Sequence, residues 1–470
     1  MAMACPMLLA SRIGKEFDVD VRFSDILKYP SVLRMEEMID QLGRKRSDDL
    51  KEDYPVMNEI AFLSTELFEE SCPMVFNLPY LYRMPVTVDV ERLKRAVTLM
   101  LNNHPGLWAR MEMRDGQIRI LQNPDHGDYI PGVRDLTEEE FRGKNRLKRP
   151  FHPEERLFRF EIYRTEEAVY LFTDVHHTLI DGGSYEIMIA EIIAAYEGRV
   201  PEPETYSIFH FLDEAERFNE KGGSEAASRN YEDAFEKLRS VGNIAPFPKD
   251  REDGELKVTR LHREFAESAE EIREIAKGLK TSPTVLLLAL SAVLKAGAAG
   301  NRTAVVNMVY DGRNDSRRVN TIGLLSTSFP VFVSWMEGTT VADYIMELQK
   351  QLVNSMGVLA QPFTKIAVAH PEIFDFGYSF LGEITDEYRM DGMTFAGEAL
   401  SPEGTGGLYG IYEEIYEKEG HFFFHTEYRA NELNEKTIDG LFRNLETMLK
   451  TVSPSKTVDE LLDGCATENR

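Results

Sequence analysis

The sequence predicts an α/β protein built from two layered lobes. Strand-like and helix-like stretches alternate from residue 54 to about 215. A polar stretch over residues 218–229 is predicted to be a crossover, and the same alternation resumes after it. The chain has 470 residues, 43% of them hydrophobic, and single cores stop growing near about 250 to 300 residues. We therefore expect a first lobe over residues 54–222 and a second over residues 223–470.

Periodicity and capping signals place the main elements of both lobes. In the second lobe, Ser268 and Glu271 have the spacing of a capping box, and Ser282 followed by Pro283 is a typical helix start. The predicted helices cover residues 90–101, 185–196, a stretch from 268, 283–294 and a final one over 435–452. The predicted strands cover residues 117–122, 168–175, 303–309, 328–333 and 421–428.

The first fifty residues differ from the rest of the chain. Two amphipathic helical stretches within residues 1–45 cannot make a stable core by themselves. Residues 46–53 are dense in charge, which is typical of a solvated linker. We expect a small helical segment, then a linker, then the two lobes.

Charge and composition exclude several classes of protein. Lys and Arg total 54 against 80 Asp and Glu, so the formal charge of -26 disfavours nucleic acid as a partner. The longest strongly apolar run, residues 284–294, is far shorter than the roughly 20 residues that span a bilayer. Cys5, Cys72 and Cys465 form neither a CxxC motif nor a Cys/His cluster. We expect a cytoplasmic protein without a membrane segment.

The candidate catalytic residues lie in one motif, residues 176–182. The predicted strand 168–175 runs into His176-His177, and the turn Asp181-Gly182 opens an amphipathic helix. Successive strand residues point to opposite faces, so one imidazole packs inward while the other faces a cleft. A neutral His177 is suited to accept a proton from an attacking amine or hydroxyl. Gly182 offers a backbone amide to a developing oxyanion, and Asp181 is expected to be structural.

The competing interpretation is that paired histidines cap a strand and that Asp-Gly merely makes a turn. With 10 His and 32 Gly in the chain, the spacing HHxxxDG is expected by chance in on the order of one chain in a thousand. Other sites are weaker: Gly404 to Gly407 lacks the Lys-Ser/Thr of a P-loop, and Cys72 is interpreted as structural. His421 and His425 lie on a predicted strand without ligand spacing, so we expect no metal.

HHxxxDG at a strand end resembles the signature of condensation domains of nonribosomal peptide synthetases, relatives of chloramphenicol acetyltransferase. Residues 54–57 and 103–111 are similar to that family's opening YPLT and RHExLRTxF motifs, and residues 312–313 and 322–330 to its GR and IGxFVNTLP motifs. The resemblance implies two acetyltransferase-like lobes forming a V with a tunnel between them. It also implies amide formation between a carrier-bound acyl or peptidyl thioester and a carrier-bound aminoacyl acceptor, with the substrates on phosphopantetheine arms and no cofactor bound by the enzyme itself. The implied site is His177, His176, Asp181 and Gly182, and the implied partners are carrier proteins and other synthetase domains.

The resemblance extends to the N-terminus and has departures. Residues 10–42 are similar to the back half of a peptidyl carrier domain, with Met3 near the place of the serine that bears phosphopantetheine. Asn103 and Trp108 stand where the second motif usually has arginines, so either Arg110 or Arg313 is the expected ion-pair partner of Asp181. Residues 206–211 and 362–363 retain only parts of the YxDFAVW and HQDxPFE motifs.

Three functions stay open. Residues 376–383 are faintly similar to a motif of epimerization domains, and 375–378 to one of plant acyltransferases, whereas residues 426–433 resemble the EYNTDLF ending of condensation domains and favour that family. The alternatives to carrier-to-carrier condensation are acyl transfer from a carrier thioester to a free amine or alcohol, and a non-catalytic module that docks carriers or an epimerization-type relative.

Overall fold

The computed structural model describes residues 50–468 apart from 57, 69–73, 126, 128, 143–146, 148, 253, 314, 316 and 401–406, together with the single positions 13, 21 and 35. The predicted carrier-like segment, most of the predicted linker, Met3, Cys5, Cys72 and residues 404–406 lie outside the described residues.

The first lobe is built on a sheet of six strands in the order β12-β13-β2-β7-β6-β5. Strand β7 (Ala168–His176) is buried along its whole length and is antiparallel to both of its neighbours. A strand buried on both faces reads as a continuous apolar run, which is what residues 168–172 provide. The other strands are β2 (Asn77–Pro85), β5 (Gly132–Asp135), β6 (Phe158–Arg164), β12 (Glu387–Met390) and β13 (Met393–Ala399).

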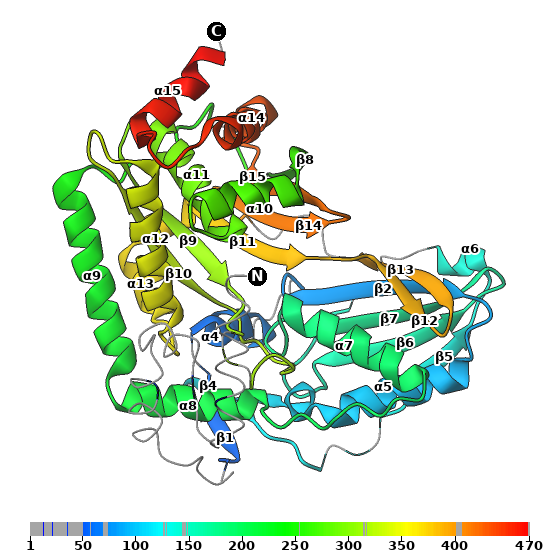
Figure 1. Ribbon diagram of the computed structural model, residues 1–470. Coiled ribbons are helices and arrows are strands. Elements are labelled where there is room, and N and C mark those ends of the chain that lie inside the picture. Colours follow the sequence, from blue (N-terminus) through cyan, green and yellow to red (C-terminus); the bar gives the residue numbers. More distant parts are fainter. Residues whose placement is uncertain are drawn as a thin grey trace.

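Two helices cover one face of this sheet and lie against each other, α5 (Val90–Asn103) and α7 (Gly182–Tyr196) (Figure 1). Side chains of both helices and of β2, β6 and β7 form one buried cluster. The predicted helices 90–101 and 185–196 and the strand 168–175 are confirmed, with α7 beginning three residues earlier than predicted. Two short helical segments complete the lobe, η2 (Pro105–Trp108) and α6 (Glu138–Phe141).

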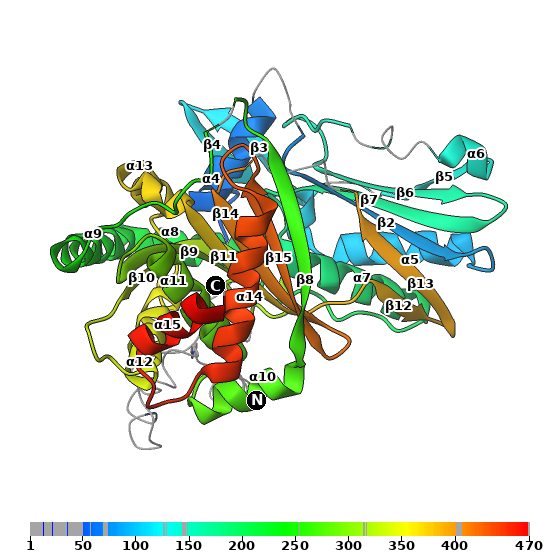
Figure 2. The ribbon, with the colours of Figure 1, turned by 90° about the horizontal axis from the view of Figure 1, so that it is seen from above.

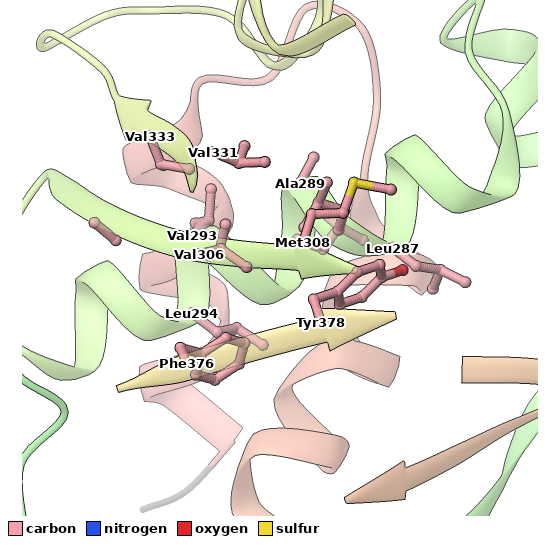
Figure 3. Packing of buried hydrophobic residues seen from close by; sticks show 14 of the residues in the cluster. Leu287, Ala289, Val293, Leu294, Val306, Met308, Val331, Val333, Phe376 and Tyr378 are labelled. Carbon is pink, nitrogen blue, oxygen red and sulfur yellow. The ribbon is translucent and has the colours of Figure 1, made fainter. Parts of the chain in front are cut away.

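The second lobe has its own sheet of six strands in the order β10-β9-β11-β14-β15-β8. The long helix α11 (Pro283–Ala298) packs on this sheet, and nearly all of its side chains are buried. Figure 3 shows Leu287, Val293 and Leu294 of this helix among side chains of β9, β10 and β11. The strands are β8 (Val258–Ser268), β9 (Thr303–Tyr310), β10 (Thr327–Ser334), β11 (Phe376–Glu383), β14 (Ile411–Lys418) and β15 (His421–Arg429).

The helices α10, α11 and α14 lie on the side of the second sheet that faces away from the first lobe (Figures 1 and 2). The capping box of Ser268 and Glu271 and the cap of Ser282 are confirmed. The remaining helical elements of the lobe are α10 (Ala269–Gly278), α12 (Val341–Met356), α13 (Phe363–Ala369), η4 (Pro371–Phe374), α14 (Glu435–Thr451) and α15 (Val458–Glu468). The predicted helix 435–452 is therefore not the final one.

The second half of the chain contributes two segments to the first lobe. Strand β13 pairs with β2 of the first lobe although residues 393–399 follow the second lobe's β11 in sequence. Ile322, Leu324 and Leu325 likewise pack in the first lobe's core. The edge of β2 offers unpaired backbone groups, and β13 satisfies them. Residues 387–399 and 322–325 thus belong structurally to the first lobe, contrary to a simple division at residue 222.

The predicted crossover over residues 218–229 is mostly helical. Helix α8 (Ile208–Glu220) is followed directly by α9 (Gly223–Val241), and the break between them is Lys221 and Gly222, with a φ of 76° at the glycine. Only glycine adopts this left-handed conformation without strain, which explains why the chain turns there. The polar residues of the stretch lie on two surface helices whose apolar sides are buried.

The predicted linker ends earlier than residue 53. Strand β1 (Asp53–Pro55) pairs with β4 (Gln117–Leu121), which also pairs with β3 (Arg110–Arg114) in a small sheet. The Lys51 ammonium lies 2.6 Å from a carboxylate oxygen of Glu216. The end of the charged stretch is therefore anchored to the first lobe. Helix α4 (Asn58–Ser64) and η1 (Thr65–Phe68) follow it.

Among the described residues, no single helix is long and apolar enough to cross a membrane. The bent pair α10 and α11, at 81° to each other, passes the test of length and composition when taken together.

Candidate active site

The end of strand β7 holds the first of the two motif histidines in the protein interior. His176 is fully buried, its Nδ1 accepts a hydrogen bond from the Thr178 amide at 3.3 Å, and its ring meets that of Phe151 edge-on. Burial, and to a smaller degree the neighbouring His177, lower the pKa of His176 to about 3. A neutral, buried ring of this kind shapes the strand end and is not available as a base.

His177 is held by two backbone contacts and is only partly buried. Its amide donates to the carbonyl oxygen of Phe76 at 2.8 Å, and its Nδ1 lies 2.8 Å from the carbonyl oxygen of Ile180. A carbonyl oxygen can only accept, so Nδ1 carries the proton, and in the neutral ring Nε2 keeps its lone pair. The turn after β7 thereby selects the tautomer in which Nε2 is a hydrogen-bond acceptor and a base.

Asp181 is the N-cap of α7. Its Oδ1 accepts from the amide of Ser184 at 3.0 Å and from the Ser184 hydroxyl at 2.9 Å, so the two residues form a capping box. Capping stabilises the start of the helix and fixes the turn that contains Ile180. Ser184 was missed by the sequence analysis, although its position three residues after Asp181 is the spacing of such a box.

Arg313 of the second lobe makes a bidentate ion pair with Asp181. Nη1 lies 2.8 Å from Oδ2 and Nη2 lies 2.9 Å from Oδ1, between residues 132 positions apart in sequence. Oδ2 also accepts from the amides of Leu325 and Ser326, both at 3.0 Å. Arg110, the other arginine expected as a partner, lies exposed on β3. The Asp181 carboxylate is thus fully engaged in holding the two lobes together.

Glycines make this joint between the lobes feasible. A Cβ at Gly183 would lie 2.9 Å from Nη1 of Arg313, and a Cβ at Gly312 would lie 2.0 Å from the carbonyl oxygen of Leu325. Gly312 also has a φ of 69°, in the left-handed region. Gly182 differs from both, because a Cβ there would meet no atom within 4 Å. The space beside Gly182, at the first turn of α7, is open.

The departures from the second motif have structural roles. The Trp108 indole donates to the carbonyl oxygen of Leu101 at 2.8 Å, and the Asn103 amide donates to that of Glu202 at 2.8 Å. His104 is buried between two carboxylates, with Nε2 at 3.0 Å from Glu191 and Nδ1 at 3.2 Å from Glu204. Neither Asn103 nor Trp108 replaces an arginine at Asp181.

The His104 cluster is charged at neutral pH. Burial opposes the charged imidazole, but the hydrogen bonds of Glu191 and Glu204 outweigh it and raise the pKa of His104 to about 9. Glu204 also accepts a hydrogen bond at 2.8 Å from the amide of Ile322, in the segment that the second lobe contributes to the first lobe's core. The cluster is therefore a second anchor of the same joint.

Among the described residues, neither His421 nor His425 belongs to a group of potential metal ligands. Both lie on β15, and the described part of the chain contains no group of three or more His, Cys, Asp or Glu residues able to hold a metal ion. Cys465 is buried, and its thiol donates to the carbonyl oxygens of Asn444 and Leu461.

The comparisons with known proteins decide the family. The sequence model described as Condensation domain matches residues 65–462. The chain belongs to the condensation-domain family. Strand β7, the HHxxxDG turn and the Arg313 joint all lie within the matched range.

Relatives of this condensation-domain chain are much longer proteins. It is 22% identical to bacitracin synthase 1 of Bacillus licheniformis over 76% of its length and 7% of that protein. It is 20% identical to bacitracin synthase 3 of the same organism over 97% of its length and 7% of that protein. Surfactin synthase subunit 1 of Bacillus subtilis is 20% identical over 92% of the chain and 12% of the subunit. The chain therefore spans only 7 to 12% of the length of these curated relatives.

Solved structures share the fold. The X-domain in a complex with OxyB from teicoplanin biosynthesis has a TM-score of 0.71 at 17% identity, over 89% of this chain and 98% of that one. The first condensation domain of the calcium-dependent antibiotic synthetase, in complex with a substrate analogue, has a TM-score of 0.66 at 15% identity, over 87% and 98%. These structural similarities confirm the predicted fold of two acetyltransferase-like lobes.

Proposed function

We propose that this chain forms an amide bond between a carrier-bound acyl or peptidyl thioester and a carrier-bound aminoacyl acceptor. The observation that carries the proposal is the Nδ1 contact of His177 with the Ile180 carbonyl at 2.8 Å, which leaves Nε2 as a base on a partly exposed ring. His176 cannot serve, because its ring is buried and neutral.

In the proposed reaction the acceptor amine attacks the thioester carbonyl carbon while Nε2 of His177 takes a proton from the amine nitrogen. A C–N bond forms and the carbonyl becomes a tetrahedral oxyanion. Collapse of the oxyanion breaks the C–S bond, and the imidazolium returns its proton to the departing thiolate. The free thiol of the donor carrier and a new amide are the products.

The first turn of α7 supports the oxyanion in this scheme. The first amides of a helix have no intrahelical carbonyl partner, and the helix dipole favours negative charge there. Gly182 is the first residue of α7, and the space beside its Cα is open. Asp181 and Arg313 act as positioning residues, because they hold the turn and touch no reacting atom.

The proposal includes the surroundings implied by the family. Two carriers deliver phosphopantetheine-bound substrates to opposite mouths of a tunnel between the lobes, and the enzyme itself binds no cofactor. The neighbouring partners are other synthetase domains, and residues 1–45 are proposed to be the end of a carrier domain. A cytoplasmic place of action is part of the proposal.

His177→Ala tests the proposal. With separately loaded donor and acceptor carriers, the variant is expected to lose about 100-fold to 10,000-fold in the rate of amide formation, measured by intact-protein mass spectrometry. His421→Ala, at the start of β15 with a side chain that is 41% exposed, is the matched histidine control and is expected to retain the wild-type rate. Undiminished turnover by a folded His177→Ala variant would refute the catalytic role.

The same experiment separates the alternatives. The free Nε2 of His177 would serve a free amine or alcohol equally well, so product formed without an acceptor carrier favours the simpler acyl transfer. Carrier binding without any product favours a docking module. A change in the stereochemistry of the loaded residue without bond formation favours an epimerization-type relative.

A further inference from the structure

The two faces of the second lobe's sheet have different surroundings. Along β14, Ile411, Glu413 and Ile415 are buried on the face covered by α11, whereas the residues between them are only partly buried. The second set lies on the opposite face, because side chains alternate along a strand. In Figures 1 and 2 the helices α10, α11 and α14 lie on the first face, and the opposite face is on the side of the first lobe. At β10 this opposite face is covered by α9, whose Phe235 packs edge-on against Phe332.

Strand register brings a row of polar side chains together on that opposite face. Asn307 of β9 is paired with Gly377 of β11, which is paired with Tyr412 of β14. Two residues further along, Ser379 of β11 is paired with Glu414 of β14. Residues directly opposite each other in neighbouring strands share a face and lie within contact distance. Asn307, Ser379, Tyr412 and Glu414 therefore form one patch, called here the polar row.

The polar row is linked along the chain to the joint at Asp181. Strand β9 ends at Tyr310, and the chain continues through Gly312 to Arg313, which grips Asp181. Gly377 has no side chain, and a Cβ there would come within 2.5 Å of the Tyr412 ring. That ring stacks on Tyr409 at 5.2 Å, and the Tyr409 hydroxyl accepts from the Asn307 amide at 2.6 Å. Tyr409 therefore holds the Tyr412 ring and the Asn307 amide of the polar row in place.

Two polar groups of the row are left without partners inside the protein. Among the described residues, the Glu414 carboxylate makes no hydrogen bond or ion pair, although burial raises its pKa to about 7. The side chain of Asn307 is fully buried, and its Oδ1 has no hydrogen-bond partner in the described part of the chain. Both are hydrogen-bond acceptors, and leaving the fully buried Asn307 oxygen unpaired costs about 1 to 3 kcal/mol.

The nearby cations are already engaged. Arg260 of β8 pairs with Glu427 through Nε and Nη2, both at 3.2 Å, and Lys418 pairs with Asp386 at 2.8 Å. Burial lowers the pKa of His262 and of His425, so both imidazoles on this face are neutral. The charge of Arg260 acts on the Glu414 carboxylate and favours its ionised form, but Arg260 makes its ion pair with Glu427. Among the described residues, the Glu414 carboxylate therefore has no ion pair of its own.

We infer that the polar row is a recognition subsite for a cationic group, an ammonium or guanidinium, on the side chain of a substrate residue, with Glu414 as the residue that determines this specificity. The inference rests on the proposed condensation function. An ammonium supplies several donors to the Glu414 carboxylate and the Asn307 amide oxygen, which can only accept, and a charge-assisted hydrogen bond to a carboxylate is about twice as strong as a neutral one.

The test compares lysine with norleucine, which has a side chain of similar length without the charge. Each is loaded in turn on the acceptor carrier and on the donor carrier, so the two arms show which substrate carries the cation. Wild-type full-length protein is expected to prefer lysine in one arm by at least tenfold in kcat/KM. Glu414→Gln should bring that ratio close to one, and Glu414→Lys should reverse it.

Two further measurements keep the outcome interpretable. Glu274→Gln, on the exposed surface of α10, is the matched control and should keep the wild-type ratio. Binding of lysyl and norleucyl amides of pantetheine, measured by calorimetry, requires no turnover, so it tests the subsite even if no amide is formed and the proposed function fails. Equal affinity and equal kcat/KM for the two side chains, or a ratio that Glu414→Gln leaves in place, would overturn the inference.

Discussion

The Asp181 carboxylate at the joint between the lobes and the Glu414 carboxylate in the polar row have opposite surroundings. At the joint, both oxygens of Asp181 are taken by Arg313, by Ser184 and by two backbone amides. In the polar row, Glu414 has no such partner among the described residues, although its strand is equally well ordered by pairing on both sides. We call the fully paired Asp181 site closed and the Glu414 site open.

This difference separates a structural site from a binding site. A buried charge is tolerated when it is paired and hydrogen-bonded, and then it fixes geometry. An acceptor that stays unpaired lowers stability, and a ligand that supplies the missing donor recovers the loss. Asp181 therefore explains how the His177 turn is held, and Glu414 indicates where a substrate group is recognised.

Breaking the closed site should have the largest effect on stability. Arg313→Met leaves the Asp181 carboxylate buried without its cation, and removal of one partner of a buried pair costs about 3 to 5 kcal/mol. Urea unfolding at neutral pH measures the loss. Arg110→Met, which removes an exposed arginine, is the control and should change the free energy of unfolding by no more than about 0.5 kcal/mol. Similar losses of unfolding free energy in both variants would show that the Arg313–Asp181 pair stabilises the fold no more than an exposed arginine does.

The second anchor of the joint predicts a pH dependence. The folded-state pKa of His104 is about 9 against about 6.5 for an unfolded histidine, so the folded state binds its proton more tightly. The resulting stability is fully present below pH 6.5 and is lost as pH rises through 9, a total of about 3 kcal/mol. Unfolding free energies from pH 6 to 9.5 measure it. His104→Gln should lack this fall, and an unaltered pH profile in that variant would contradict the charged state.

A change at the open Glu414 site should have the smallest effect on stability. This effect should depend on pH, because it arises from the titration of one carboxylate. Burial raises the pKa of Glu414 from 4.5 to about 7, so its contribution to stability is present below pH 4.5 and is lost as pH rises through 7. Glu414→Gln removes this loss and should be more stable than wild type at pH 8 by on the order of 1 kcal/mol. Thermal unfolding at pH 5 and pH 8 checks the sign. A destabilised variant at pH 8 would mean that Glu414 has an internal partner after all.

Local sequence patterns were sufficient for much of the fold and for the motif turn. The apolar run before His176 and the Asp-Gly pair after it predict a strand, a turn and a helix, and the structure has β7, the turn and α7 in that order. Ser282 with Pro283 likewise predicts the start of α11. These features depend on residues within a few positions of one another, so their physical cause is visible in the sequence.

Contacts between distant segments were decided only by the tertiary structure. Arg313 and Arg110 are equally basic in the sequence, and only the path of the chain from β9 brings Arg313 to Asp181. The pairing of β13 with β2 and the position of Glu414 beside Ser379 depend on which strand edges meet. Pairing of strands and of charges across hundreds of residues leaves no periodic signal in the chain, because its energy arises only when the two surfaces are brought together.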